Sequence, residues 1–311
     1  MPVHEGEYKF ISAGNFNGSY DELFQTLTTP EFFPLLHDFA ESFERISALH
    51  DLPIQLIAWA DHLAKCHARV RLRFGLDIDD ESKMSDSDYS EAIDKEFTSA
   101  GETNAEARKF GAKQLDGMMR WEEKVVGKTN PASIGVQALF SAMAMSAYIA
   151  LENLCADLWI RSVNRQSKLA TNWIGKNPRK DFGGAATFGR GFNLESSMGT
   201  ILFEQKKVTF TSWNEIKSAY ADAFNHELDN VFEPAAPLYL AEKTRHLFAH
   251  KAGIIDHQFL QQVESYPEFK NAEVGKRLRL TGPIVLERVS ACLDCGIKLL
   301  RGVDHWVMKN T

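Results

Sequence analysis

Residues 141–161 read SAMAMSAYIALENLCADLWIR, and this stretch decides the fold class. It lies inside the longest apolar stretch of the chain, residues 138–160, which by length alone resembles a membrane span. Glu152, Asn153 and Asp157 interrupt the apolar side chains, and polar groups of this kind are costly inside a bilayer. The stretch therefore predicts a long helix buried in the core of a soluble helical protein.

Helical patterns recur on both sides of this stretch. Pro34 and Pro53 stand where helices can begin, because the first turn of a helix tolerates a residue without an N–H. Alternation typical of strands is sparse, and residues 207–211 (KVTFT) are the best candidate for a strand. The sequence therefore predicts an all-α fold, with helices over residues 34–49, 53–74, 133–164, 212–230, 237–251, 256–266 and 283–307 and one or two helices within 91–126.

The chain divides by charge as well as by length. A chain of 311 residues suggests about two domains, and the turn-forming segment 127–131 (GKTNP) is the predicted boundary. Residues 1–130 hold 14 Lys and Arg against 24 Asp and Glu, a net charge of −10, whereas residues 131–311 hold 21 against 18, a net charge of +3. The acidic region would repel phosphates and the second half would accept them; alternatively, the acidic surface only keeps the protein soluble.

The composition also restricts the cellular setting. Apolar residues make up 44% of the chain and aromatic residues 11%, which is enough for a sizeable core. The four cysteines are too few for a disulfide scaffold and fit a reducing compartment. The first ten residues, MPVHEGEYKF, lack the pattern of a signal peptide. We therefore expect a cytoplasmic protein without membrane contact, whose acidic helical region 1–130 senses a signal, binds a protein partner or neutralises the second half.

The segment that says most about function is residues 242–260, EKTRHLFAHKAGIIDHQFL. Four residues separate Arg245 from His250. Gly253 stands where a helix would end, and Asp256 stands where the side chain could cap the next helix. The segment thus predicts two helices joined by a tight turn, with an Arg and a His near the end of the first helix.

This arrangement resembles the HEPN superfamily, whose signature is an Arg, a polar residue directly after it (here His246), a short apolar gap and a His at or near the helix end. Residues 141–161 look like the family's first core helix, because an acidic residue is set in an apolar stripe. The resemblance covers roughly residues 133–311 and is specific only across the segment that carries the Arg and the His. Residues 1–130 resemble no family that we can name.

The resemblance implies a bundle of four to five helices that commonly dimerises. It also implies endoribonuclease activity without a metal or other cofactor, often in toxin systems or antiviral defence. Many members of the superfamily are not enzymes, so the alternative is a non-catalytic scaffold that binds a protein or nucleotide partner.

The residue types also suit RNA cleavage when they are considered without the family resemblance. RNA cleavage by the 2′-hydroxyl needs a base, an acid and positive charge near the phosphate. Histidine can act as acid or base near neutral pH, and the planar guanidinium of Arg suits phosphate, so His250 and Arg245 are the candidate catalytic residues, with His246 assisting. On a helix Arg245 and His250 lie roughly 140° apart and His246 and His250 about 40° apart. One copy therefore offers an incomplete site, and a homodimer through the C-terminal half would double the set of groups.

Glu152 is the fourth candidate. It lies among apolar residues, where an unpaired carboxylate would be costly. Pairing with Arg245 from a neighbouring core helix would satisfy both charges and orient the guanidinium. The alternative is that Glu152 faces solvent together with Asn153.

A glycine- and aromatic-rich segment, residues 173–192, is the candidate RNA-binding loop. Its cations could follow phosphates while its Phe side chains stack on bases; alternatively, the segment is a surface insertion whose Phe residues pack on the bundle. The cations are Lys176, Arg179, Lys180 and Arg190.

No metal site is predicted. His62, Cys66 and His67 share a helix, but no carboxylate is placed to complete a zinc site; His246, His250 and His257 could in principle bind a metal ion. Cys292 and Cys295 form a lone CxxC within a helical pattern, which favours a core role.

Overall fold

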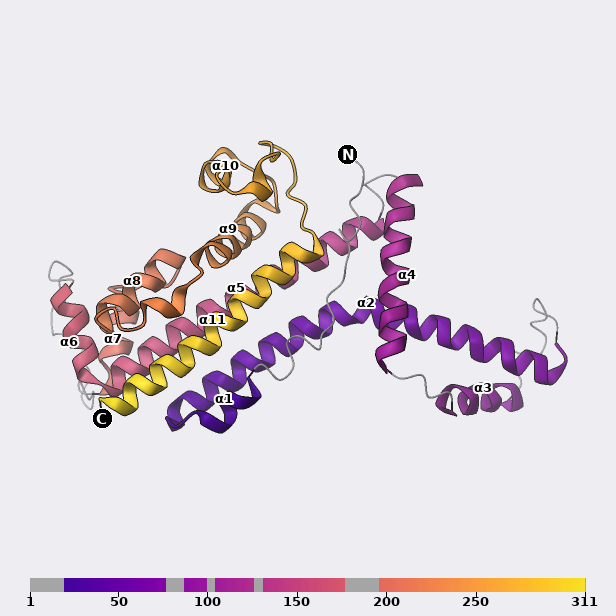
Figure 1. The fold of residues 1–311 in the computed structure, drawn as a ribbon, viewed down its shortest axis with the longest axis horizontal. Helices are drawn as coiled ribbons and strands as arrows, with labels where there is room; N and C mark the ends of the chain where they lie inside the picture. Colours follow the sequence, from indigo (N-terminus) through magenta and orange to yellow (C-terminus); the bar gives the residue numbers. More distant parts are fainter. Residues whose placement is uncertain (1–19, 77–86, 100–103, 126–130, 177–195, 311) are drawn as a thin grey trace. The chain divides into compact units, whose positions relative to one another are not determined.

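The computed structural model describes residues 20–76, 87–99, 104–125, 131–176 and 196–310 (Figure 1). These residues form helices and no named strand, which confirms the all-α class; one isolated antiparallel bridge joins Ile254 to Arg277. The elements, in chain order, are α1 (Asp21–Thr26), η2 (Pro30–Phe32), α2 (Phe33–Phe74), α3 (Ser87–Ser99), α4 (Asn104–Val125), α5 (Pro131–Arg165), α6 (Ser167–Lys176), α7 (Met198–Glu204), α8 (Trp213–Ala223), η5 (Asp229–Phe232), α9 (Ala235–Lys251), α10 (His257–Val263), η6 (Pro267–Phe269) and α11 (Gly282–Lys309).

Three predictions about local structure are wrong. The helix expected over residues 212–230 ends at Ala223, because Asn225 and His226 adopt positive φ and a separate 3-10 turn follows at Asp229–Phe232. The helices expected over residues 34–49 and 53–74 form the single helix α2, with Pro53 inside it. Proline removes only one donor from the helical ladder, and burial of Ile54 and Ala58 directly after it favours continuation. Residues 207–211 form no strand: Val208 and Phe210 are buried and the segment ends at the N-terminus of α8, so their alternation reflects two side chains entering the core.

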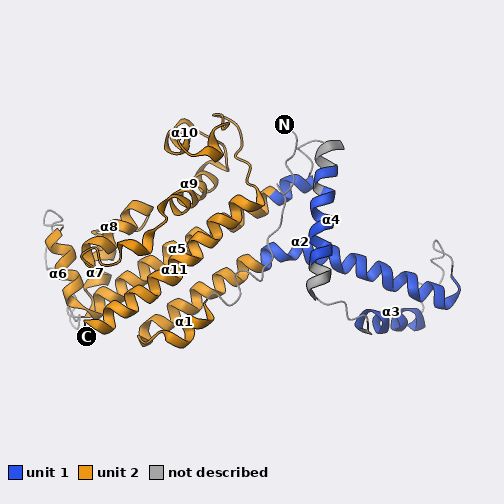
Figure 2. Ribbon diagram, viewed as in Figure 1, with its two compact units in different colours: residues 1–12, 48–136 blue, residues 13–47, 137–311 orange. Residues whose placement is uncertain are grey.

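Two compact units make up the chain (Figure 2). One holds Ala13–Ser47 and Gln137–Thr311, and the other holds Met1–Ser12 and Ala48–Val136. This division differs from a single split at residues 127–131, because the first part of α2 packs with the second half of the chain: any side chain at Gly296 of α11 would collide with the ring of Phe39. A segment distant in sequence thus completes the helical core that holds the candidate site.

The core of the larger unit is built around α5 and α11. On α5, Met143, Tyr148 and Trp159 are fully buried, and Cys292 and Cys295 lie buried on α11. The buried cysteines agree with the core role predicted for them. By length and composition α5 is also able to cross a membrane. This is weak evidence for a membrane span, because the core helix of a soluble protein passes the same test and half of the most apolar window of α5 is buried.

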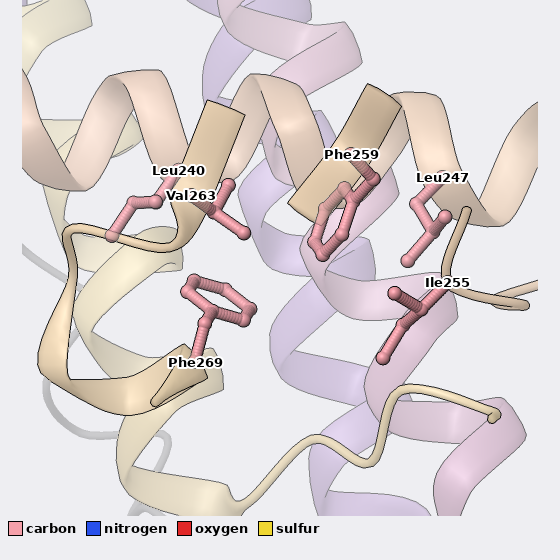
Figure 3. Close-up of a cluster of buried hydrophobic side chains, with 6 residues drawn as sticks. All are labelled: Leu240, Leu247, Ile255, Phe259, Val263 and Phe269. Atoms are coloured by element: carbon pink, nitrogen blue, oxygen red, sulfur yellow. The ribbon is translucent and has the colours of Figure 1, made fainter. Parts of the chain in front are cut away.

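A smaller apolar cluster fixes α10 and η6 against α9 (Figure 3). Leu240 and Leu247 of α9 face Phe259 and Val263 of α10, and Phe259 meets the ring of Phe269 edge to face at 5.5 Å between centroids. Because this cluster joins the two helices on either side of the 251–256 turn, it sets the position of the residues around the end of α9.

Candidate active site at the end of α9

The turn that ends α9 depends on a glycine. Ala252 adopts the left-handed conformation at φ 49°, Gly253 follows at φ 79°, and the Gly253 N–H donates to the Leu247 carbonyl over 3.2 Å. A Cβ on Gly253 would lie 2.6 Å from the ring of Phe248. The predicted helix end at Gly253 is therefore confirmed, and a side chain there would be both strained and too close to its neighbour.

Asp256 caps α10 as the sequence predicted. Its Oδ1 accepts the backbone N–H of Phe259 over 2.8 Å, and Lys251 lies 3.6 Å from Oδ2. The capping hydrogen bond holds the pKa of Asp256 below its usual value. The two helices of the segment are thus joined by a turn whose ends are both fixed.

His246 and His250 form a pair on the exposed face of α9. Their ring centroids are 4.5 Å apart, with 53° between the planes, and both residues are exposed. Partial burial lowers the pKa of His246, and the charges of His250, Arg245 and Lys243 lower it further against the opposing effect of Glu242. One imidazole that stays neutral next to a second histidine is an arrangement suited to general acid and base catalysis.

Arg245 points away from this pair and meets Glu152 of α5. Arg245 Nη2 lies 3.1 Å from Glu152 Oε2, and the two side chains are 23% and 18% exposed. The contact is an ion pair without hydrogen-bond geometry, since Glu152 Oε2 accepts no hydrogen bond. Because α9 continues through Lys251, Arg245 and His250 stay roughly 140° apart around the helix.

Burial governs the charge of Glu152. It raises the pKa of Glu152, with Arg245 opposing the rise and Glu242 adding to it. Of the two positions considered for Glu152, paired with Arg245 or facing solvent with Asn153, the structure has the first. Glu152 thus supplies a partly buried counter-charge that fixes the guanidinium of Arg245.

Glu242 is a part of the site that the sequence did not single out. This residue is buried; its Oε2 accepts the backbone N–H of Trp213 over 3.2 Å, and its Oε1 accepts from Lys243 over 2.7 Å. It therefore links α9 to the first turn of α8. An acidic residue three positions before Arg245 was visible in the sequence, but nothing in the sequence placed Trp213 beside it.

A polar pocket of about 190 Å³ opens between α9 and α10, next to the histidine pair. His246 and Lys243 line it from α9, and Gln258 and Gln262 line it from α10. The two glutamines are four residues apart and therefore share one face of α10. This spacing is visible in the sequence, but its relevance becomes clear only when α10 is seen to face α9. The pocket therefore holds amides and two Lys–carboxylate pairs, Lys243 with Glu242 and Lys251 with Asp256, beside the candidate acid and base.

The predicted RNA-binding loop mostly lies outside the described residues. Lys176 is exposed at the end of α6, whereas Arg179, Lys180 and Arg190 fall in the segment that the structure does not describe. Their role stays a prediction.

The candidate metal ligands do not come together. In the described part of the chain, the one group of three potential ligands within 4.8 Å is His37, Asp38 and Glu41 on the exposed surface of α2. His246, His250 and His257 form no such group there.

Removing one member of the histidine pair should change the other. In His250→Ala the pKa of His246 is expected to rise, because a neighbouring positive charge is lost, and to stay below 6.5, because burial is the larger cause of the shift. NMR titration of the His246 ring in the wild type and in His250→Ala measures this. His257→Ala is the control, since His257 is exposed and does not contribute to the shift. An unchanged His246 pKa in His250→Ala would contradict the pairing.

Comparison with known proteins does not add to this description of the site. No family model, curated protein or solved structure matches the chain. Any function must therefore be argued from the geometry of the site and from the residues that form it.

Proposed function

We propose that the protein is an endoribonuclease of HEPN type that cleaves RNA by attack of the 2′-hydroxyl without a metal ion. The observation that carries the proposal is the exposed His246–His250 pair, with ring centroids 4.5 Å apart, at the end of a helix whose Arg245 is held by Glu152. These are the residue types that the reaction needs for proton transfer and for phosphate charge.

Each residue has a role in this proposal. We assign His246 as the base, since its lowered pKa keeps the ring neutral at neutral pH, and His250 as the acid for the leaving 5′-oxygen. Arg245 supplies positive charge for the phosphate, which requires its guanidinium to reach the substrate while Nη2 stays beside Glu152. Glu152 is a positioning residue in this scheme.

The pocket between α9 and α10 would take the nucleotide next to the cleaved bond. His246 lines the pocket and also belongs to the histidine pair, so a group held in the pocket would lie beside the reacting phosphate. Gln258 and Gln262 offer amide donors and acceptors for a base edge, while Lys243 and Lys251 pair with Glu242 and Asp256 in the same pocket.

A second copy of the chain would complete the site. One α9 end supplies a histidine pair and one guanidinium that points elsewhere, so the acid, the base and the phosphate ligand need not come from the same copy. The wider setting that the resemblance implies, a toxin or antiviral system in the cytoplasm, is part of the same proposal.

Purified protein incubated with RNA in excess EDTA tests the proposal. We expect cleavage to persist, because the histidines carry the proton transfers themselves. Loss of cleavage in EDTA and its return with zinc or manganese would replace the proposal with a metal-dependent mechanism.

The alternative function is a non-catalytic helical scaffold that binds a protein or nucleotide partner. The net charge of −7 favours it, because acidic proteins bind RNA poorly overall. Wild-type protein that binds a nucleotide in the α9–α10 pocket but never cleaves RNA would support this alternative.

A further inference from the structure

The second part of α2 carries an apolar stripe that faces solvent. Its members are 38–57% exposed, although all are large hydrophobic residues. At 100° per residue they fall within an arc of about 80°, and their spacing alternates between three and four residues, which is the a/d pattern of a helix that packs against another helix. They are Leu49, Leu52, Leu56, Trp59 and Leu63, and we call them the exposed stripe.

The same pattern continues into a part of α2 that is already covered by a helix. Cys66 and Val70 are the next positions of the heptad and both are fully buried. Val70 packs in a cluster with Tyr89 and Ile93 of α3, which lies along this part of α2 in Figure 1. One face of α2 thus docks a helix over its last turns and remains open over residues 49–63.

α3 is too short to cover the rest. It has 13 residues, and its contacts run from Tyr89, whose ring lies 5.9 Å from that of Phe74, to Phe97, whose ring lies 4.7 Å from that of His62. Among the described residues, α3 therefore ends level with the last member of the exposed stripe. The other four members of the stripe remain 38–57% exposed.

The residues beside the stripe restrict the partner. Pro53, Gln55 and Ala60 carry no charge, and the ring of His62 meets that of Phe97 edge to face. Charged residues at these flanking positions usually select a partner helix of opposite charge, and none is present. The surface suits an apolar helix of the same kind, and it neither attracts a charged partner nor repels a copy of itself.

We propose that two copies of the chain associate through their exposed stripes, with a two-fold axis passing near Leu56, the middle member. Such an interface is self-complementary, because each stripe meets the same stripe of the other copy. This inference goes beyond the proposed function and does not depend on it.

The second half of the chain offers no comparable surface among its described residues. Its exposed large hydrophobic side chains stand singly rather than in a stripe: only Ile134 and Ile149 share a helix, α5, and they lie far apart along it, and scattered exposure of this kind is ordinary. They are Ile134, Ile149, Phe203, Ile254, Val274 and Met308. The described apolar surface thus points to α2 for this contact between copies, which is separate from the shared site proposed at the end of α9.

The interface should be weak and strengthened by salt. Five half-exposed side chains from each copy correspond to the low end of interface sizes, for which dissociation constants of roughly micromolar magnitude are ordinary. The net charge of −10 on residues 1–130 brings like charges together on association, and salt screens that repulsion.

Sedimentation of the full chain between roughly 1 and 200 µM, at low and high salt, tests the proposal. We expect the wild type to shift from monomer to dimer with concentration, and at lower concentration in high salt. The double variant Leu52→Glu/Leu56→Glu should remain monomeric throughout. Leu72→Glu is the matched control: it changes a more exposed leucine, 81% exposed, on the opposite face of α2, and should dimerise like the wild type.

A cysteine variant keeps the test valid if the double variant does not fold. Leu56→Cys should form a disulfide between copies under mild oxidation, whereas Leu72→Cys should not. The four native cysteines are free and buried, so they do not compete. Wild type that stays monomeric at every concentration and salt, or Leu56→Cys that cross-links no better than Leu72→Cys, would overturn the proposal.

Discussion

His250→Ala is expected to lower the rate of RNA cleavage by about 10²–10⁴-fold, the range typical for loss of a general acid or base. Arg245→Ala is expected to lower it by about 10²–10³-fold, because the cation proposed to stabilise the phosphate charge is removed. His250 is exposed, so its replacement should leave the free energy of unfolding nearly unchanged. Cleavage rates and chemical denaturation of the same preparations measure both quantities.

Two matched variants control for charge and for histidine content. His257→Ala removes an exposed histidine outside the pair, and Arg301→Ala removes an arginine that pairs with the exposed Glu22 over 3.2 Å. Both should cleave RNA at the wild-type rate. If His250→Ala cleaves as fast as His257→Ala, the histidine pair is not the catalytic site.

Arg245→Ala also reports on Glu152. The variant leaves a partly buried carboxylate without its cation, and burial already raises the pKa of Glu152. Protonation of that carboxylate limits the loss of stability to about 1–2 kcal/mol. A loss several times larger would mean that the ion pair holds the fold rather than the site.

Phe259→Ala is expected to have the largest effect on stability, a loss of about 3–5 kcal/mol in the free energy of unfolding. Phe259 is 5% exposed, lies at the centre of the cluster that joins α10 to α9, and meets the ring of Phe269. Its removal leaves a cavity between the two helices that a small local cluster cannot close. Urea denaturation followed by circular dichroism measures the change.

Leu260→Ala is the control for Phe259→Ala. Leu260 is the next residue of α10 and only partly buried at the edge of the same cluster, so its truncation should cost clearly less. Because the cluster also sets the pocket that Gln258 and Gln262 line, Phe259→Ala should weaken RNA binding as well. A stability loss below about 1 kcal/mol would show that the cluster does not fix α10.

The sequence predicted the α9–α10 segment well, because its signals are local. Gly253 ends one helix through its backbone conformation and Asp256 begins the next through its side chain, and neither effect needs a distant partner. The pairing of Glu152 with Arg245 could also be anticipated, since a buried carboxylate needs a counter-charge.

What the sequence missed depends on contacts between distant segments. The continuity of α2 through Pro53 depends on packing that outweighs one lost hydrogen bond. The burial of Glu242 depends on Trp213, 29 residues earlier. The heptad spacing of the exposed stripe was present in the sequence, but its exposure appears only once α3 is seen to end beside His62.

The most direct test of the central claim is the chemistry of the RNA ends after cleavage in excess EDTA. Attack by the 2′-hydroxyl with histidines as base and acid leaves a 2′,3′-cyclic phosphate and a 5′-hydroxyl. The account predicts these ends, produced by wild-type protein and not by His250→Ala. A 5′-phosphate with a 3′-hydroxyl, or no cleavage of any RNA by the wild type, would contradict it.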